Sequence, residues 1–163
     1  MIPVGAAPEQ PVPNALPPTQ FTSGMSLNPQ EILRGMYSKQ KDENTFTLDR
    51  ARIVDACNAL RAAGFEHLTL ITCIDWKDKF EMVYHITKYG RKELVALRVM
   101  LPYKDPTIPS ITSVWPGAGW HERENFDLLG IMFTGNKDLR RILLPDDFEG
   151  HPLRKEVKYG NTS

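Results

Sequence analysis

The chain has 163 residues, of which 41% are hydrophobic, and this length and composition suit one folded domain with extensions. Its 20 basic and 20 acidic residues leave no net charge, which argues against a protein that binds nucleic acid through an overall basic surface. Its apolar runs fall short of the roughly 18 residues that a membrane-spanning helix needs, so membrane association is expected only through partner proteins.

Residues 1–27 form a proline-rich N-terminal extension with few large apolar side chains. Such a segment cannot bury enough surface to fold alone, so we expect it to be extended or polyproline-like. No Arg precedes Arg34, and no basic start is followed by an apolar run. Neither a secretory nor a mitochondrial signal is therefore predicted, and the cytoplasm of a prokaryote fits best.

Two helices are predicted in the first part of the chain. Asn28 followed by Pro29 is typical of a helix start and predicts a short helix to about Tyr37. Between residues 49 and 63, apolar residues recur at helical spacing, and Gly64 predicts the end of this second helix.

Three strands are predicted next, at residues 68–76, 80–88 and 93–101, which are rich in β-branched and aromatic residues. Short polar connections join them, which indicates consecutive antiparallel strands. Helices followed by a run of strands predict an α+β fold, with the helices packed on one face of a mainly antiparallel sheet. The cysteines, Cys57 and Cys73, fall in a predicted helix and strand and are expected to be buried packing groups.

A third helix is predicted over residues 120–131, and it mixes charged and apolar side chains. At 100° per residue, Glu122, Glu124 and Asp127 fall among large apolar groups rather than on a separate polar face. Such charges are tolerable only if they meet partners, either within the chain or on another protein. Gly130 predicts the end of this helix.

Residues 134–163 contain Pro145 and Gly150 and are predicted to hold at most one short helix, around residues 138–143. The few large apolar residues of this tail have little of their own chain to pack against, so we expect it to order on a neighbouring protein. The predicted organisation is an extension (1–27), an α+β core domain (28–133) and an extended C-terminal subunit-docking tail (134–163).

Four sequence blocks follow one another in the last third of the chain: Trp120–Glu124, Asp127–Ile131, Asp138–Pro145 and Gly150–Lys155. Their order and spacing resemble the signature of the thirty-kilodalton subunit family of respiratory complex I and its relatives. The resemblance covers roughly residues 51–155. The chain departs from the family pattern at Asn136 and Lys137, where the family usually has His and Pro.

The resemblance implies a cofactor-free structural subunit of the membrane-extrinsic arm of a complex I-type oxidoreductase. Such a complex passes electrons to a quinone-like acceptor and couples this to ion translocation, with NADH, a deazaflavin coenzyme or ferredoxin as donor. A subunit of a membrane-bound nickel-iron hydrogenase is the alternative. The implied partners are the forty-nine-kilodalton subunit and cluster-bearing subunits, which hold iron-sulfur clusters with or without flavin. The implied location is peripheral, on the cytoplasmic side of the cell membrane.

No catalytic, cofactor-binding or metal-binding residue is predicted in this chain, because two cysteines are too few for a cluster and no glycine-rich nucleotide loop follows a strand. A metal hydrolase built on His121, Glu124 and His151 is a remote alternative, although Asn125 replaces the second His of a zinc-protease helix. The charge pattern and the resemblance together predict the following partner-binding residues: Trp120, Glu122, Arg123, Glu124, Asp127, Arg140, Arg141, Asp146, Asp147, Arg154 and Lys155.

Overall fold

The structure of the chain is a computed structural model that describes residues 28–90 and 92–156. The extension predicted for residues 1–27 lies outside this part of the chain, and so do residues 157–163 at the end of the predicted tail.

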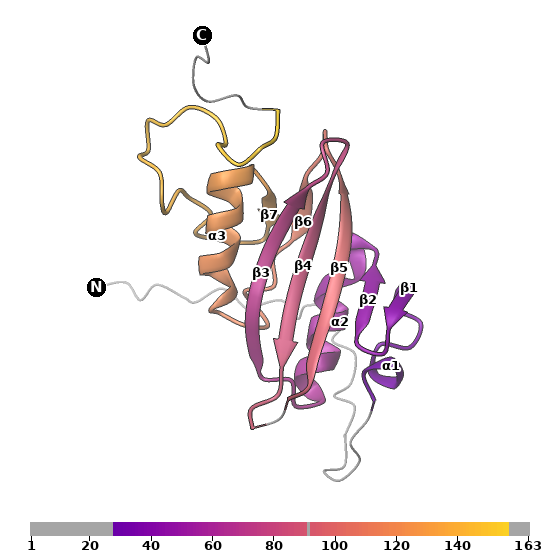
Figure 1. The fold of residues 1–163 in the computed structure, drawn as a ribbon. Coiled ribbons are helices and arrows are strands. Elements are labelled where there is room, and N and C mark those ends of the chain that lie inside the picture. Colours follow the sequence, from indigo (N-terminus) through magenta and orange to yellow (C-terminus); the bar gives the residue numbers. More distant parts are fainter. Residues whose placement is uncertain (1–27, 91, 157–163) are drawn as a thin grey trace, which may run out of the picture.

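Five strands form the central sheet in the order β1, β2, β5, β4, β3 (Figure 1). They are β1 (Tyr37–Asp42), β2 (Thr45–Leu48), β3 (His67–Asp75), β4 (Lys79–Thr87) and β5 (Leu94–Pro102). All neighbouring pairs are antiparallel except β2 and β5, which are parallel. The predicted α+β fold with a mainly antiparallel sheet is therefore confirmed, and the three predicted strands are β3, β4 and β5, each displaced by one residue.

The hairpin of β1 and β2 was not predicted, and the first helix is shorter than expected. Helix α1 (Pro29–Ile32) starts as predicted, with the Asn28 side chain accepting a hydrogen bond from the backbone of Gln30. The helix ends well before Tyr37, because Gly35 turns the chain at a positive φ of 77° and β1 follows. Strand β1 is a polar edge strand, so it lacks the apolar alternation that sequence analysis uses.

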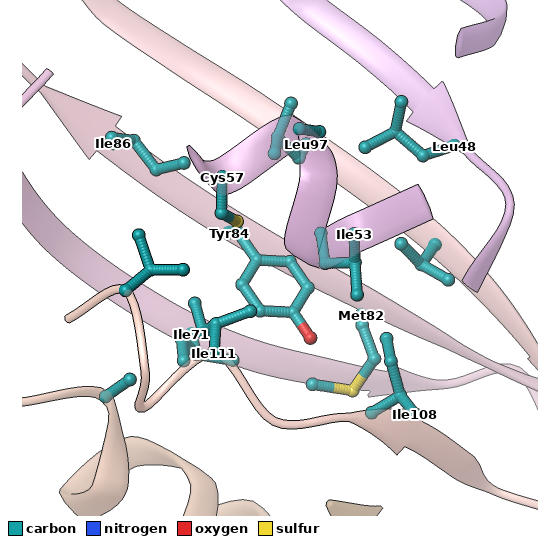
Figure 2. Close-up of a cluster of buried hydrophobic side chains, with 14 of the residues drawn as sticks. Leu48, Ile53, Cys57, Ile71, Met82, Tyr84, Ile86, Leu97, Ile108 and Ile111 are labelled. Carbon is teal, nitrogen blue, oxygen red and sulfur yellow. The ribbon is translucent and has the colours of Figure 1, made fainter. Parts of the chain in front are cut away.

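One face of the sheet packs against α2 (Ile53–Ala62), which follows the short 3-10 helix η1 (Arg50–Arg52). The apolar stripe of α2 is buried against alternate residues of β4 and β5. Figure 2 shows Ile53 and Cys57 of α2 beside the ring of Tyr84 from β4. This layer is the hydrophobic core of the domain.

Both cysteines belong to this packing. Cys57 is completely buried, and Cys73 is half-buried against the core. Burial raises the pKa of Cys57 far above its ordinary value and raises that of Cys73 to about 12. The two thiols are therefore protonated packing groups at neutral pH, as expected.

The segments before and after the third helix pair as a second, two-stranded parallel sheet. It consists of β6 (Thr107–Pro109) and β7 (Met132–Thr134), and α3 (Ala118–Leu129) connects them. The backbone N–H of Ser110 donates to the carbonyl of Thr134 at 2.8 Å and extends this pairing. Each strand has three residues, which is too short for a recognisable sequence pattern, so neither was predicted.

Helix α3 lies along β3, the edge strand of the large sheet (Figure 1). The Asn125 side chain donates a hydrogen bond to the carbonyl of Ile71 at 3.1 Å, so the helix occupies a backbone group that the strand edge leaves open. Gly130 ends the helix in the left-handed conformation, as predicted. None of the helices in the described ranges is long and apolar enough to cross a membrane.

Candidate partner-docking site

Helix α3 buries several polar side chains that an ordinary surface helix would expose. Glu122, Asn125 and Asp127 are buried, whereas Trp120 and Glu124 are exposed. The buried charges meet their partners within this chain, which explains how charged and apolar side chains mix along the helix.

The Glu122 carboxylate is bound by three neutral donors from the segments that flank α3. It accepts hydrogen bonds from the hydroxyl of Ser110 at 2.8 Å, from the backbone N–H of Ile111 at 2.9 Å and from the side-chain amide of Asn136 at 2.8 Å. Burial raises the pKa of Glu122, and these hydrogen bonds only partly oppose that effect. Asn136, where the chain departs from the family pattern, thus supplies one of the donors.

The Asp127 carboxylate, one turn later, binds the tail. One of its oxygens accepts a hydrogen bond from the Arg141 guanidinium at 2.6 Å. The other accepts from the backbone N–H groups of Ile142, Leu143 and Leu144, at 3.0, 2.8 and 3.0 Å. Burial alone would raise the pKa of Asp127, but the three N–H groups and the guanidinium outweigh it and lower this pKa to about 2.

Two arginines bind the backbone of the tail. Arg141 also donates to the carbonyls of Phe148 and Gly150, at 2.7 and 3.1 Å. Arg123, from α3, donates to the carbonyls of Arg140 and Arg141, at 3.3 and 3.0 Å. Residues 138–143 are irregular chain that begins in a turn and ends in a bend, and no helix forms there.

Arg154 fixes the following part of the tail to the end of α3 and to the large sheet. Its Nε donates to the carbonyl of Leu129 at 2.7 Å, and its guanidinium lies 5.4 and 5.7 Å from the ring centres of Phe80 and Tyr103. A Cβ atom on Gly130 would lie 2.6 Å from the Arg154 side chain. The absence of a side chain at Gly130 is thus needed for the approach of the tail as well as for the helix end.

Asp75, at the end of β3, accepts a hydrogen bond from the backbone N–H of Lys155 at 2.8 Å. Together with Asp127 and Arg154, it holds the described part of the tail on α3 and on one end of the sheet. The sequence did not reveal these intramolecular bonds. Binding of a partner by the tail stays a prediction.

The predicted partner-binding residues divide into two groups. Those largely withdrawn from solvent, which bind other parts of this chain, are Glu122, Arg123, Asp127, Arg141 and Arg154. Those that are exposed are Trp120, Glu124, Arg140, Asp146, Asp147 and Lys155. Two exposed apolar residues of the tail, Leu143 and Leu153, were not among the predicted partner-binding residues. We call Trp120, Leu143, Leu153 and the exposed Glu124 and Arg140 the tail surface.

An open hollow of about 530 Å³ lies beside Trp120. The residues that line it include Thr112, Ser113, Pro116 and Lys137. Trp120 itself is 67% exposed, an unusual degree of exposure for the largest side chain. The hollow gives a neighbouring side chain a place to insert against the indole ring.

The residues considered for a metal site do not gather. Among residues 28–90 and 92–156, no three His, Cys, Asp or Glu side chains are placed to share a metal ion. The ring of His151 lies instead on the end of α3, with its Nδ1 at 3.0 Å from the carbonyl oxygen of Asp127. This geometry gives no support to a hydrolase built on His121, Glu124 and His151.

Comparison with known proteins places these features in a family. Residues 46–163 match the family described as "Respiratory-chain NADH dehydrogenase, 30 Kd subunit". An NADH-quinone oxidoreductase subunit from Roseiflexus castenholzii is 42% identical over 113 residues, which cover 69% of this chain and 65% of that relative. The chain therefore spans less than two thirds of the length of this relative.

Two solved structures have the same fold. A trypsin-resistant fragment of Nqo5 is 32% identical with a TM-score of 0.53, and the match covers 58% of this chain and 81% of that one. A chain from the membrane-bound sulfane sulfur reductase, an archaeal respiratory membrane complex, is 24% identical with a TM-score of 0.70. That match covers 80% of this chain and 83% of the other, and it concerns the fold alone.

Proposed function

The chain belongs to the 30-kDa subunit family of the respiratory-chain NADH dehydrogenases, and we propose that it is a cofactor-free structural subunit of a complex I-type oxidoreductase. In this proposal it lies in the membrane-extrinsic arm, on the cytoplasmic side of the cell membrane, and reaches the membrane only through its partners. The complex passes electrons to a quinone-like acceptor and couples this to ion translocation. The role of the chain is to hold its neighbours in fixed positions.

The observation that supports this proposal best is the way the tail is bound to α3. Asp127, Arg123 and Arg141 fix the tail backbone from the inside, and Trp120, Leu143 and other large side chains are left exposed on the outside. Large apolar side chains held in place on a surface are typical of the core of a protein interface. Fixing them in advance lowers the entropy lost on binding.

The proposed partners are the forty-nine-kilodalton subunit and the cluster-bearing subunits of the same complex. The exposed charges of Glu124, Arg140, Asp146 and Asp147 are suited to the polar rim of such a contact, where they add specificity more than affinity. Iron-sulfur clusters, with or without flavin, reside in those partners in this proposal.

NADH is the proposed electron donor, because the relative from Roseiflexus is named for an NADH-quinone reaction. A deazaflavin coenzyme and ferredoxin are the other donors that the sequence resemblance implied. The nickel-iron hydrogenase alternative has no feature of the described residues in its favour.

The test is to recover the complex through an affinity tag on this chain. Tagged wild-type chain is purified from detergent-solubilised membranes, and the proteins that accompany it are identified by mass spectrometry and tested for NADH-dependent quinone reduction. We expect cluster-bearing subunits in fixed ratio to the chain. A Trp120→Ala chain is expected to bind them on the order of 30-fold more weakly, because an interface Trp commonly contributes about 2 kcal/mol or more.

Tyr89→Ala is the matched control, because Tyr89 is 68% exposed, much like Trp120, but lies in the turn between β4 and β5. This variant is expected to keep the partners. Recovery of the wild-type chain by itself, from membranes that contain the assembled complex, would refute the proposed membership of the complex. Equal retention by the Trp120 and Tyr89 variants would refute the tail surface as the contact.

A further inference from the structure

The large sheet has a second face, which α2 does not cover. Residues on this face alternate with the core residues along each strand, so Ile74 of β3 lies opposite Glu81 of β4, and Glu81 lies opposite Met100 of β5. In Figure 1 this face is turned toward the viewer, and none of the labelled helices lies across it. Any layer that covers it must come from elsewhere.

An apolar patch lies at one end of this face. Ile74, Trp76 and Met100 are 37%, 51% and 42% exposed. Beside them, the buried Glu81 carboxylate accepts hydrogen bonds from the indole N–H of Trp76 at 2.9 Å and from the Arg98 guanidinium at 2.8 Å. We call Ile74, Trp76, Glu81, Arg98 and Met100 the sheet-face patch.

The hydrogen bond to Glu81 holds the Trp76 indole in one orientation, with its ring still half-exposed. A fixed aromatic ring loses little conformational entropy when a neighbour covers it. Trp, Met and Arg are also the residue types enriched in interface cores. Chemistry and geometry of the patch therefore both fit a docking surface rather than a solvated sheet face.

The charges around Trp76 favour an acidic neighbour. Asp78 pairs with Lys79, and Glu156 pairs with Arg154. Asp75 is buried and accepts hydrogen bonds from the backbone N–H groups of Lys77 and Lys155. Lys155 lies with its Nζ 5.9 Å from the Trp76 ring centre and is exposed.

One further basic group adds to this effect. Lys77, in the turn directly after Trp76, is exposed. The charge of Arg98 is already paired with Glu81. An apolar centre with a basic rim is complementary to a surface with an apolar centre and an acidic rim.

We propose that the sheet-face patch is a second docking surface, and that it takes another protein subunit of the same complex. That subunit presents an apolar side chain to Trp76 and Met100 and carboxylates to Lys77 and Lys155. The inference rests on the proposed function, since it assumes that the chain works inside a multisubunit complex. It adds that the chain bridges two neighbours, one on the tail surface and one on the open face of the sheet.

Site-specific photocrosslinking in the assembled complex tests this bridge. The photoreactive residue p-benzoylphenylalanine replaces Met100 in one chain, Leu143 of the tail surface in a second, and Tyr89 as the control in a third. Each tagged complex is irradiated in its membrane, purified and analysed by mass spectrometry. We expect the probe at position 100 to label a subunit other than the one labelled from position 143, at a segment that contains Asp or Glu. The probe at position 89 is expected to label neither.

Substitutions measure the strength of the contact. Trp76→Ala is expected to weaken retention of the subunit labelled from position 100 on the order of 30-fold. Lys155→Glu is expected to weaken it too, because it places a negative charge against the acidic rim. If Trp76→Ala lowers the melting temperature of the chain by itself, Met100→Ala replaces it, because Met100 makes no bond to Glu81.

The outcomes separate this inference from the proposed function. Suppose that the tag recovers the complex and that the probe at position 143 labels a subunit. The sheet-face patch is then refuted if the probe at position 100 labels nothing, or if it labels lipid, a second copy of the chain or residues 157–163. It is also refuted if both positions label the same subunit. If the tag recovers no other subunit, the proposed function fails, and the bridge fails with it.

Discussion

A carboxylate is buried near each end of α3, and the pKa values of the two are shifted in opposite directions. Glu122 meets only neutral donors, so burial prevails and its pKa is raised. Asp127 meets a guanidinium and three backbone N–H groups, so its pKa is lowered to about 2. The comparison shows that burial alone does not decide the charge of a carboxylate, because the number and charge of its donors can reverse the effect.

The two carboxylates also bind different parts of the chain. Glu122 joins the segment before α3 to the turn after β7, through Ile111 and Asn136, and no positive charge takes part. Asp127 holds the tail, and its ionised form is required. The tail is therefore expected to be the part of the domain that is most sensitive to charge, pH and substitution.

The largest effect is expected from Asp127→Asn. The new amide N–H₂ group faces other hydrogen-bond donors. Arg141 is also left largely buried without its counter-charge, and the loss of one partner of such a pair typically lowers the unfolding free energy by about 3 to 5 kcal/mol. Urea denaturation measures this loss, and faster amide exchange at residues 142–144 shows whether the tail is released. Asp146→Asn, at an exposed carboxylate of the same tail, is the control and is expected to change stability by no more than about 0.5 kcal/mol. Equal effects of the two substitutions would contradict the special position of Asp127.

Gly130→Ala tests the same end of the helix through its shape. Gly130 and Gly135 both have positive φ, 72° and 91°, so Ala at either position is strained by about 1 to 3 kcal/mol. Only at Gly130 does the added Cβ also meet side chains, at 2.6 Å from Arg154 and His151. We therefore expect Gly130→Ala to be the more destabilising of the pair in thermal melts. A Gly135→Ala chain that melts at the lower temperature would show that the tail does not press against the helix end.

The long elements of this fold could be predicted from the sequence, and the short ones could not. Strands β3, β4 and β5 are nine residues each, long enough for their composition to stand out. Strand β6 has three residues, one of them Pro109, and β1 is polar. Strand β6 pairs with β7, which lies beyond α3 in the sequence, and local patterns carry no trace of that pairing.

The site was predictable to a similar degree. The mixed pattern of α3 indicated that Glu122 and Asp127 need partners, but it could not identify them. Three partners of Asp127 are backbone N–H groups, which every residue except proline carries, so no side-chain motif announces them. The open face of the sheet was not predicted, for another reason. Apolar composition predicts a strand, but it does not tell which of its two faces another layer covers.

Acidification should change the contributions of the two carboxylates to stability in opposite directions. The folded pKa of Asp127 lies below its ordinary value of 3.8, so its contribution is complete above about pH 4 and is lost as the pH falls toward 2. The shift corresponds to roughly 2 kcal/mol. The stability difference between wild type and Asp127→Asn, measured by urea denaturation, is expected to shrink by this amount between pH 5 and pH 2. A constant difference would mean that Asp127 is not ionised in the folded chain.

The smallest effect is expected from Glu122→Gln. Gln keeps an oxygen that accepts from the Ile111 N–H, and no cation is left unpaired, so at pH 7 we expect a change within about 1 kcal/mol. The folded pKa of Glu122 is raised above 4.5, so the wild-type chain gains stability as the pH falls through that pKa toward 4.5, and the variant does not. The stability difference between wild type and Glu122→Gln should therefore move in favour of wild type on acidification, whereas the difference between wild type and Asp127→Asn shrinks.

Glu122→Ala is the contrasting variant, because it leaves the donors of Ile111 and Asn136 without an acceptor and should cost about 1 to 3 kcal/mol. If Glu122→Gln were as damaging as Asp127→Asn, an unseen positive charge would have to lie beside Glu122, and the contrast between the two ends of α3 would be lost.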